Sequence, residues 1–358
     1  MKEQNLGQLF RNRSEEHASL TRWRTPRKGQ WLSATGKENQ AQVYEIMGGL
    51  HTLGAKKGDT IGILSNTSAE WLQTDWASWA LGAVTVTIYP SLLADTIKFI
   101  INDAQLKYLF VENKEQYDKL LTIRADIPEV ERVIVYDTTN MPTDDWVLTF
   151  ADLRKLHTGS AEERSALAEK FASEMDRDTL ATIVYTSGTT GNPKGAMLTH
   201  GCFIAQCEAL RDRLPQLMPG DVDLMFLPAA HIFGRAQHVI GVDRGLNTAI
   251  TESVKTVLDD LQSVKPTFFF SVPRIYEKIF TTAKARSEAK PATKKIFSWA
   301  LGVGRAMSHL MEQKKQPGLA LKIQYAIADK LVFSKVRNLL GGQLKFAITG
   351  GAPLDLEI

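Results

Sequence analysis

The residues best suited to chemistry lie between Tyr185 and Gly195, after the β-branched and apolar run 182–185, which predicts a buried strand. The stretch combines hydroxyls, glycines, a proline and one lysine. Its members are Thr186, Ser187, Gly188, Thr189, Thr190, Gly191, Asn192, Pro193 and Lys194. Glycines permit positive φ, so that backbone amides can converge on an anion, and a lysine adds a mobile positive charge. The stretch therefore predicts a phosphate-binding loop.

This loop differs from the P-loop of nucleotide triphosphatases. The P-loop pattern places Gly, Lys and Ser/Thr consecutively, whereas Lys194 lies between Pro193 and Gly195. P-loop mechanics are therefore not expected. The alternative is a plain glycine-rich turn, which would not need hydroxyls, glycines and a lysine together.

The stretch from Tyr185 to Gly195 resembles the phosphate-binding signature of the adenylate-forming (AMP-binding) superfamily. That superfamily includes acyl-CoA synthetases, luciferases and the adenylation domains of peptide synthetases. The resemblance implies that Thr186 supplies a hydroxyl on the magnesium side. It also implies that residues 187–194 hold the β- and γ-phosphates of ATP.

A second stretch, Leu227–Arg235, resembles the aromatic and histidine motif that lines the acyl pocket in this superfamily. The resemblance implies a substrate pocket formed by His231, Ile232, Phe233 and Arg235. A histidine after a strand commonly has a structural role instead. A general base is not expected, because the attacking carboxylate is already ionised.

Two further stretches extend the resemblance. Ser271–Lys278 is similar to the long-chain acyl-CoA synthetase branch, and a helical stretch between Arg274 and Gly350 resembles an insertion of that branch. The turn from Thr349 to Leu354 resembles the one that packs against adenine. Its implied nucleotide-binding residues are Gly350, Gly351, Ala352 and Pro353.

The resemblance as a whole implies a long-chain fatty acid–CoA ligase. Such an enzyme uses ATP, Mg²⁺ and coenzyme A to convert a fatty acid into acyl-AMP and then acyl-CoA, and Thr186 and Lys194 would act in the first step. Two alternatives stay open. One is another carboxylate-activating enzyme, such as a fatty acyl-AMP ligase or an aryl-CoA ligase. The other is an ATP- or acyl-binding module without turnover.

The family pattern continues beyond Gly350 with a Thr-Glu stretch, a Thr-Gly-Asp stretch and a small C-terminal domain that carries a catalytic lysine. This sequence ends at Ile358. We therefore expect an N-terminal fragment with an incomplete active site.

Length and composition agree with a globular protein of more than one core-forming unit, since the chain has 358 residues, 44 % of them hydrophobic and 23 % charged. The net charge of +3 gives no general case for nucleic-acid binding. Cys202 and Cys207 offer no disulfide framework, which favours a cytoplasmic location.

Strands alternate with helices along most of the chain, which predicts an α/β fold built from mostly parallel sheets. We expect two α/β subdomains, at 1–175 and 176–358, the first opening with an irregular lead-in over 1–30 that could hold one short helix. Expected strands are 60–64, 83–88, 108–111, 132–136, 182–185, 224–227, 247–250, 267–270 and 345–349. Expected helices are 39–53, 68–81, 94–102, 114–123, 161–174, 200–214 and 254–264. The uncharged run 76–94 should form a helix and then a strand, and should not span a membrane.

Residues 281–340 form a basic and helical stretch, with 12 basic and 3 acidic residues and a net charge of +9. One interpretation is a solvated helical face. The other is peripheral contact with an anionic membrane surface, to which each well-placed cation contributes about 1 kcal/mol.

Overall fold

The computed structural model describes residues 3–27, 30–186, 191–251, 253 and 255–355. It divides the chain into two compact units. The first comprises residues 1–221 and 225–252, and the second comprises residues 222–224 and 253–358. The expected subdomain boundary at residue 176 therefore lies inside the first unit.

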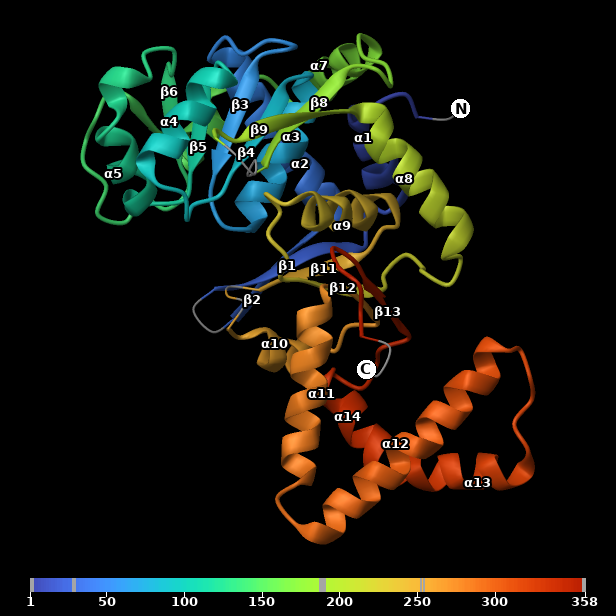
Figure 1. Cartoon of the computed structure of the whole chain (residues 1–358). Coiled ribbons are helices and arrows are strands. Elements are labelled where there is room, and N and C mark those ends of the chain that lie inside the picture. The colour runs from blue at the N-terminus through green and yellow to red at the C-terminus, as the bar shows by residue number, and fades with distance from the viewer. Residues whose placement is uncertain (1–2, 28–29, 187–190, 252, 254, 356–358) are drawn as a thin grey trace. The chain divides into compact units, whose positions relative to one another are not determined.

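The first unit contains a seven-stranded sheet in the order β7-β6-β5-β3-β4-β8-β9 (Figure 1). All neighbouring strands are parallel except β8 and β9, which form an antiparallel pair at one edge. The strands are β3 (Thr60–Leu64), β4 (Val84–Ile88), β5 (Tyr108–Val111), β6 (Arg132–Val135), β7 (Val147–Thr149), β8 (Leu180–Thr186) and β9 (Lys194–Thr199). The mostly parallel α/β architecture is as predicted.

Helices of this unit connect and cover the strands (Figure 1). They are α1 (Leu6–Glu16), α2 (Gly36–Thr52), α3 (Ala69–Leu81), α4 (Ala94–Asp103), α5 (Lys114–Leu121), α6 (Phe150–Leu156), α7 (Ala161–Ser173), α8 (His200–Arg213), α9 (Ile232–Asp243) and the 3₁₀ turn η1 (Arg124–Asp126). Helix α3 shows how local sequence sets such boundaries. The Ser68 side chain accepts the backbone N–H of Trp71 at its start, and Gly82 ends it at φ 81°.

The lead-in predicted over residues 1–30 contains the one short helix that was allowed for, but it also contains a strand that was not predicted. Helix α1 buries Leu6, Leu9 and Phe10 on one face, at helical spacing. Strand β1 (Thr21–Arg27) then pairs in parallel with β11 (Asn247–Ile250) and antiparallel with β2 (Gln30–Thr35). One of the two partners of β1 lies more than 200 residues away, and local sequence gives no signal for that pairing.

The core of the first unit is rich in aromatic side chains. Trp71, Trp76 and Trp79 on α3 are at most 1 % exposed, as expected for tryptophans that fill a core. The run 76–94 forms the end of α3 and β4, as predicted. No helix within the described residues is long and apolar enough to cross a membrane.

The second unit contains a parallel pair of strands and a helical region (Figure 1). Its elements are β10 (Val222–Met225, whose last residue falls in the first unit), β12 (Phe268–Ser271), β13 (Phe346–Thr349), α10 (Val257–Val264), α11 (Pro273–Ser287), α12 (Pro291–Glu312), α13 (Leu319–Ala328), the π-helical turn η2 (Asp329–Phe333) and α14 (Ser334–Leu339). The helical character predicted for 281–340 is confirmed. A small core in this region is centred on Phe297, Ala300 and Val332.

Candidate functional site

The predicted phosphate loop connects the antiparallel strands β8 and β9. Thr186 ends β8 and Lys194 begins β9, and their Cα atoms are direct partners in the register. Both side chains are exposed. The hydroxyl and the ammonium therefore lie side by side at the loop end of the hairpin, where a polyphosphate can reach both.

The loop itself is only partly described. Ser187, Gly188, Thr189 and Thr190 lie outside the described residues. Gly191 has φ 108°, which is the left-handed conformation that favours glycine. Gly195 packs closely against β8, because a Cβ there would lie 2.7 Å from Cγ2 of Ile183.

The turn that carries His231 is anchored at the carboxyl ends of two strands. The Thr87 hydroxyl at the end of β4 donates to the Ala230 carbonyl over 3.0 Å, and Ala229 N–H donates to Oγ1 of Thr67, just beyond β3, over 2.8 Å. Thr87 is the register partner of Val184 on β8. The histidine motif and the loop of the hairpin therefore both lie at the carboxyl ends of the parallel strands. Ligands bind at this end of the strands in open α/β folds.

His231 is the N-cap of α9. Its Nδ1 accepts the backbone N–H of Phe233 over 3.2 Å, which leaves the rest of the ring exposed. Ile232 is 39 % exposed and Phe233 is half-buried. These three residues can line an open surface beside the strand ends.

Arg235 belongs to the core instead. Its side chain is 0 % exposed, and its Nε donates to Oδ2 of Asp75 over 3.0 Å. Its Nη1 donates to Oγ1 of Thr182 over 2.7 Å, and its Nη2 contacts Asp75 and Thr85. We therefore leave Arg235 out of the proposed pocket: it ties α9 to α3, β4 and β8, and so positions His231.

Burial sets the electrostatics of this pair. It raises the pKa of the Asp75 carboxyl, the nearby Arg235 guanidinium opposes that shift, and the pKa that results is about 6. The contact with the guanidinium favours the ionised carboxylate, so that the two charges are matched within the core. Asp75 was not anticipated from the sequence, since nothing near it indicates a partner 160 residues away.

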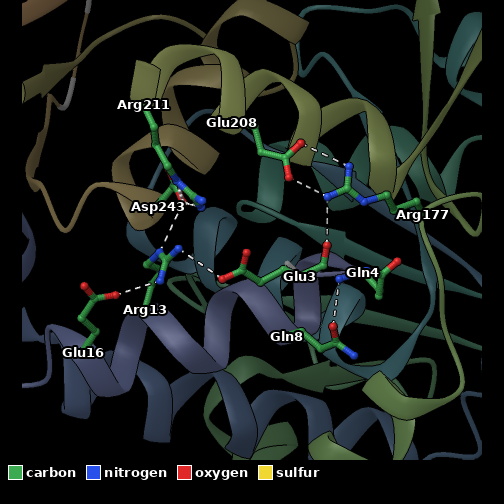
Figure 2. Close-up of polar contacts among 9 residues, drawn as sticks. All are labelled: Glu3, Gln4, Gln8, Arg13, Glu16, Arg177, Glu208, Arg211 and Asp243. Carbon is green, nitrogen blue, oxygen red and sulfur yellow. Dashed lines mark hydrogen bonds and ion pairs between the residues drawn. The ribbon is translucent and has the colours of Figure 1, made fainter. Parts of the chain in front are cut away.

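A second set of ion pairs holds α8, the helix that follows the hairpin (Figure 2). Arg211 of α8 donates from Nε to Oδ2 of Asp243 on α9 over 2.9 Å. Arg13 of α1 contacts the same carboxylate over 3.3 Å and contacts Glu3 over 3.1 Å. The Asp243 side chain is 1 % exposed, so these contacts fix the helices around a buried charge.

The predicted adenine-binding turn lies in the second unit. Strand β13 pairs in parallel with β12, and Gly350 N–H donates to the Ser271 carbonyl over 3.2 Å. Gly351 has φ 83° and, like Ala352 and Pro353, is exposed. Backbone without a large side chain is thus open at the end of a strand, which suits a flat ring.

The described residues hold no cluster of three or more His, Cys, Asp or Glu side chains that could bind a metal ion. Thr186 could contribute one hydroxyl to a Mg²⁺ ion that is carried in by a nucleotide. The described donor set fits no independent metal centre.

Comparisons with known proteins agree with this arrangement. A sequence model of the family described as AMP-binding enzyme matches residues 11–358. Long-chain-fatty-acid–CoA ligase FadD15 of Mycobacterium tuberculosis is 32 % identical over 331 residues, which cover 92 % of this chain and 53 % of that protein. Long chain acyl-CoA synthetase 7, peroxisomal, of Arabidopsis thaliana is 32 % identical over 336 residues, covering 92 % of this chain and 46 % of that protein. This chain spans about half the length of these curated relatives.

Solved structures show the same fold. The N-terminal domain of FACL13 from Mycobacterium tuberculosis matches with a TM-score of 0.69 at 21 % identity, over 99 % of this chain and 71 % of that chain. A red-emitting luciferase from Phrixothrix hirtus matches with a TM-score of 0.69 at 15 % identity, over 98 % of this chain and 57 % of that one. Together with the hairpin and the histidine turn, these matches lead to one conclusion: the chain belongs to the AMP-binding enzyme family.

Proposed function

We propose that this chain supplies the phosphate-binding hairpin and part of the acyl pocket of a long-chain fatty acid–CoA ligase. The observation that carries the proposal is the pairing of Thr186 with Lys194 at the loop end of the β8–β9 hairpin. The long-chain acyl-CoA ligases among the relatives support the choice of a fatty acid as the substrate.

The proposed reaction begins when a fatty carboxylate oxygen attacks the α-phosphorus of ATP. A new bond forms between that oxygen and phosphorus, the bond from the α-phosphorus to the bridging oxygen breaks, and pyrophosphate leaves. Negative charge then accumulates on the leaving group. Lys194 would stabilise that charge electrostatically, since it is exposed beside Thr186.

Mg²⁺ bound with the nucleotide would further neutralise the phosphates, with the Thr186 hydroxyl as one contact. In the second half-reaction, the coenzyme A thiolate would attack the acyl carbon and displace AMP. His231, Ile232 and Phe233 are proposed to contact the acyl group, and the turn from Gly350 to Pro353 is proposed to contact adenine.

We also propose a cytoplasmic protein that contacts an anionic membrane surface peripherally. Helix α13 supports this, because Leu319, Ile323 and Ile327 form a stripe at i, i+4 and i+8 with exposed fractions of 75 %, 53 % and 48 %. Lys322 and Lys330 are exposed on the same segment. An exposed apolar stripe flanked by lysines is typical of helices that lie in a membrane interface.

The test is the binding of non-hydrolysable acyl-AMP analogues of increasing chain length to the 358-residue chain, measured by titration calorimetry, because binding does not require the complete active site. Affinity that rises with chain length would support the fatty acid ligase. A preference for aryl analogues would favour an aryl-CoA ligase, and ATP binding with no affinity for any acyl-AMP analogue would favour a binding module.

Lys194→Ala tests the hairpin directly. We expect ATP affinity to fall roughly tenfold or more, because a charge-assisted contact is lost. Lys194→Arg should retain part of it. The control is Lys155→Ala, whose side chain is 77 % exposed on α6. Equal ATP affinity in all variants would reject the proposed role.

A further inference from the structure

The helical region of the second unit contains two adjoining cavities of about 330 and 420 Å³. Both lie among α11, α12 and the η2–α14 segment, and Ala283, Phe297, Val332 and Val336 line both. Their volumes fall in the range of small-molecule sites, about 300–1,000 Å³. None of their lining residues belongs to the hairpin, the histidine turn or the 350–353 turn.

The chemistry of the lining is that of a site for an amphiphile. Aliphatic and aromatic side chains dominate the smaller cavity, which opens beside Ile296 and Leu331, 39 % and 42 % exposed. Arg286 and Lys335 are exposed and also line it. Among the described residues neither cation has an acidic partner, so both are available to a ligand.

The hydroxyls at this cavity are already used as donors. Thr293 donates to the Ser287 carbonyl over 2.6 Å, and Ser287 donates to the Lys284 carbonyl over 2.6 Å. The groups that remain free to donate to a ligand are therefore cationic. An apolar chamber with two available cations complements one anionic head and one long hydrocarbon chain.

We propose that this cavity pair binds a long-chain fatty acid anion, at a site separate from the acyl pocket beside His231. The carboxylate contacts Arg286 and Lys335, and the hydrocarbon chain packs against Ala283, Phe297 and Val332. The choice of a fatty acid over another anionic amphiphile rests on the proposed function. Leu331 lines the smaller cavity and follows the exposed stripe of α13 in the sequence.

The experiment uses the 358-residue chain and a hexadecanoate analogue that carries a photoreactive diazirine in its chain. Cross-linked peptides are mapped by mass spectrometry, with and without excess hexadecanoate, and affinity is measured by equilibrium dialysis. We expect adducts within α11, α12 and η2 that excess hexadecanoate removes. Excess lysophosphatidic acid serves as the rival head group: if it competes and hexadecanoate does not, the fatty acid assignment is overturned.

Matched variants separate the cavity from the helix surface. Ala283→Trp fills both cavities, whereas Ala285→Trp places the same side chain on an exposed position of α11 that lines neither. The double variant Arg286→Glu/Lys335→Glu reverses the cations, and Lys284→Glu is its control. We expect roughly tenfold weaker binding for Ala283→Trp and for the double variant, and no change for the controls.

Two outcomes would overturn the inference while leaving the proposed function intact: adducts confined to residues 231–233, or equal affinity in all cavity variants. The converse is also distinguishable. Lys194→Ala should weaken ATP binding and leave the labelling of α11 and α12 unchanged. Circular dichroism of each variant confirms that it is folded.

Discussion

Arg235 joins four elements of the first unit through one guanidinium, and its burial makes the pairing obligatory. Its partner Asp75 is likewise 0 % exposed, so neither charge can be hydrated. Removing one partner leaves the other as an uncompensated buried charge, whereas removing both leaves only a packing change.

Arg235→Met should therefore lower the free energy of unfolding by about 3–5 kcal/mol. The double variant Asp75→Leu/Arg235→Met should recover much of that loss. Urea denaturation measures both, with Lys155→Met as a surface control expected to change stability by less than about 0.5 kcal/mol. A loss in Arg235→Met no larger than in the control would contradict the argument.

His200 is a second buried group, and its burial should be measurable as a pH dependence of stability. Its ring is 0 % exposed, and its Nδ1 accepts the backbone N–H of Leu6 over 3.2 Å. Burial lowers the pKa of this imidazole to about 4, against a smaller opposing effect of Asp176. The folded state therefore holds the ring neutral at pH values where the unfolded chain takes up a proton.

The sign of the pH effect follows from that difference. Above the unfolded pKa of about 6.5, the His200 imidazole is neutral in both the folded and the unfolded chain. Below that pH the unfolded chain is favoured, because its imidazole takes up a proton while the folded one does not. As the pH falls from about 7.5 to about 4.5, we expect His200 to lower the free energy of unfolding by about 2.5 kcal/mol. His200→Gln keeps an acceptor for Leu6 and should remove this part of the pH dependence. Parallel stability profiles for the two proteins would be inconsistent with a neutral buried ring.

At the scale of elements, the start of α9 is held by close backbone packing. A Cβ at Gly234 would lie 2.3 Å from the Pro228 carbonyl oxygen, so no side chain fits there without moving the helix. The same helix carries His231, Ile232 and Phe233 at its first turn. The glycine therefore sets how near the proposed pocket residues lie to the strand ends.

Gly234→Ala should destabilise the protein by about 1–3 kcal/mol, because the added methyl overpacks the contact. Gly302→Ala on α12 is the matched control, since nothing lies within 4 Å of the position its Cβ would take. That control should gain roughly 0.5–1 kcal/mol from helix propensity. Thermal unfolding of both variants measures the contrast, and equal effects would refute the packing argument.

At the scale of the whole molecule, charge and exposed apolar surface both concentrate in residues 281–340. The net charge of that segment is +9 in a chain whose total is +3, so the rest of the chain is net acidic. The exposed stripe of Leu319, Ile323 and Ile327 lies in the same segment. An anionic surface would therefore attract this segment.

Co-sedimentation with vesicles should show binding that requires anionic lipid and weakens as salt rises. The double variant Lys322→Glu/Lys330→Glu should weaken the free energy of vesicle binding by about 2 kcal/mol or more, since each well-placed lysine contributes about 1 kcal/mol. Lys155→Glu on α6 is the control. Binding that does not depend on anionic lipid would remove the membrane proposal.

The sequence by itself determined the elements whose signals are local. Periodicity, caps and glycines located β3, β5, α3 and β11 to within a residue or two, because a strand or helix in a buried α/β layer carries its own apolar pattern. The hydroxyl- and glycine-rich stretch likewise indicated a phosphate loop, because glycines let backbone amides converge on an anion and hydroxyls can donate to it. The family resemblance then located the turn of His231.

Only the tertiary structure decided the features that depend on residues far apart in the chain. Strand β1 pairs with β11, more than 200 residues away, as well as with β2, and β9, which was not expected, places Lys194 opposite Thr186. The motif predicts Arg235 as a pocket residue. In the structure Arg235 forms an ion pair in the core, because folding places Asp75 beside it. Local propensity has no information about such partners, since the free energy that selects them comes from burial and pairing across the assembled fold.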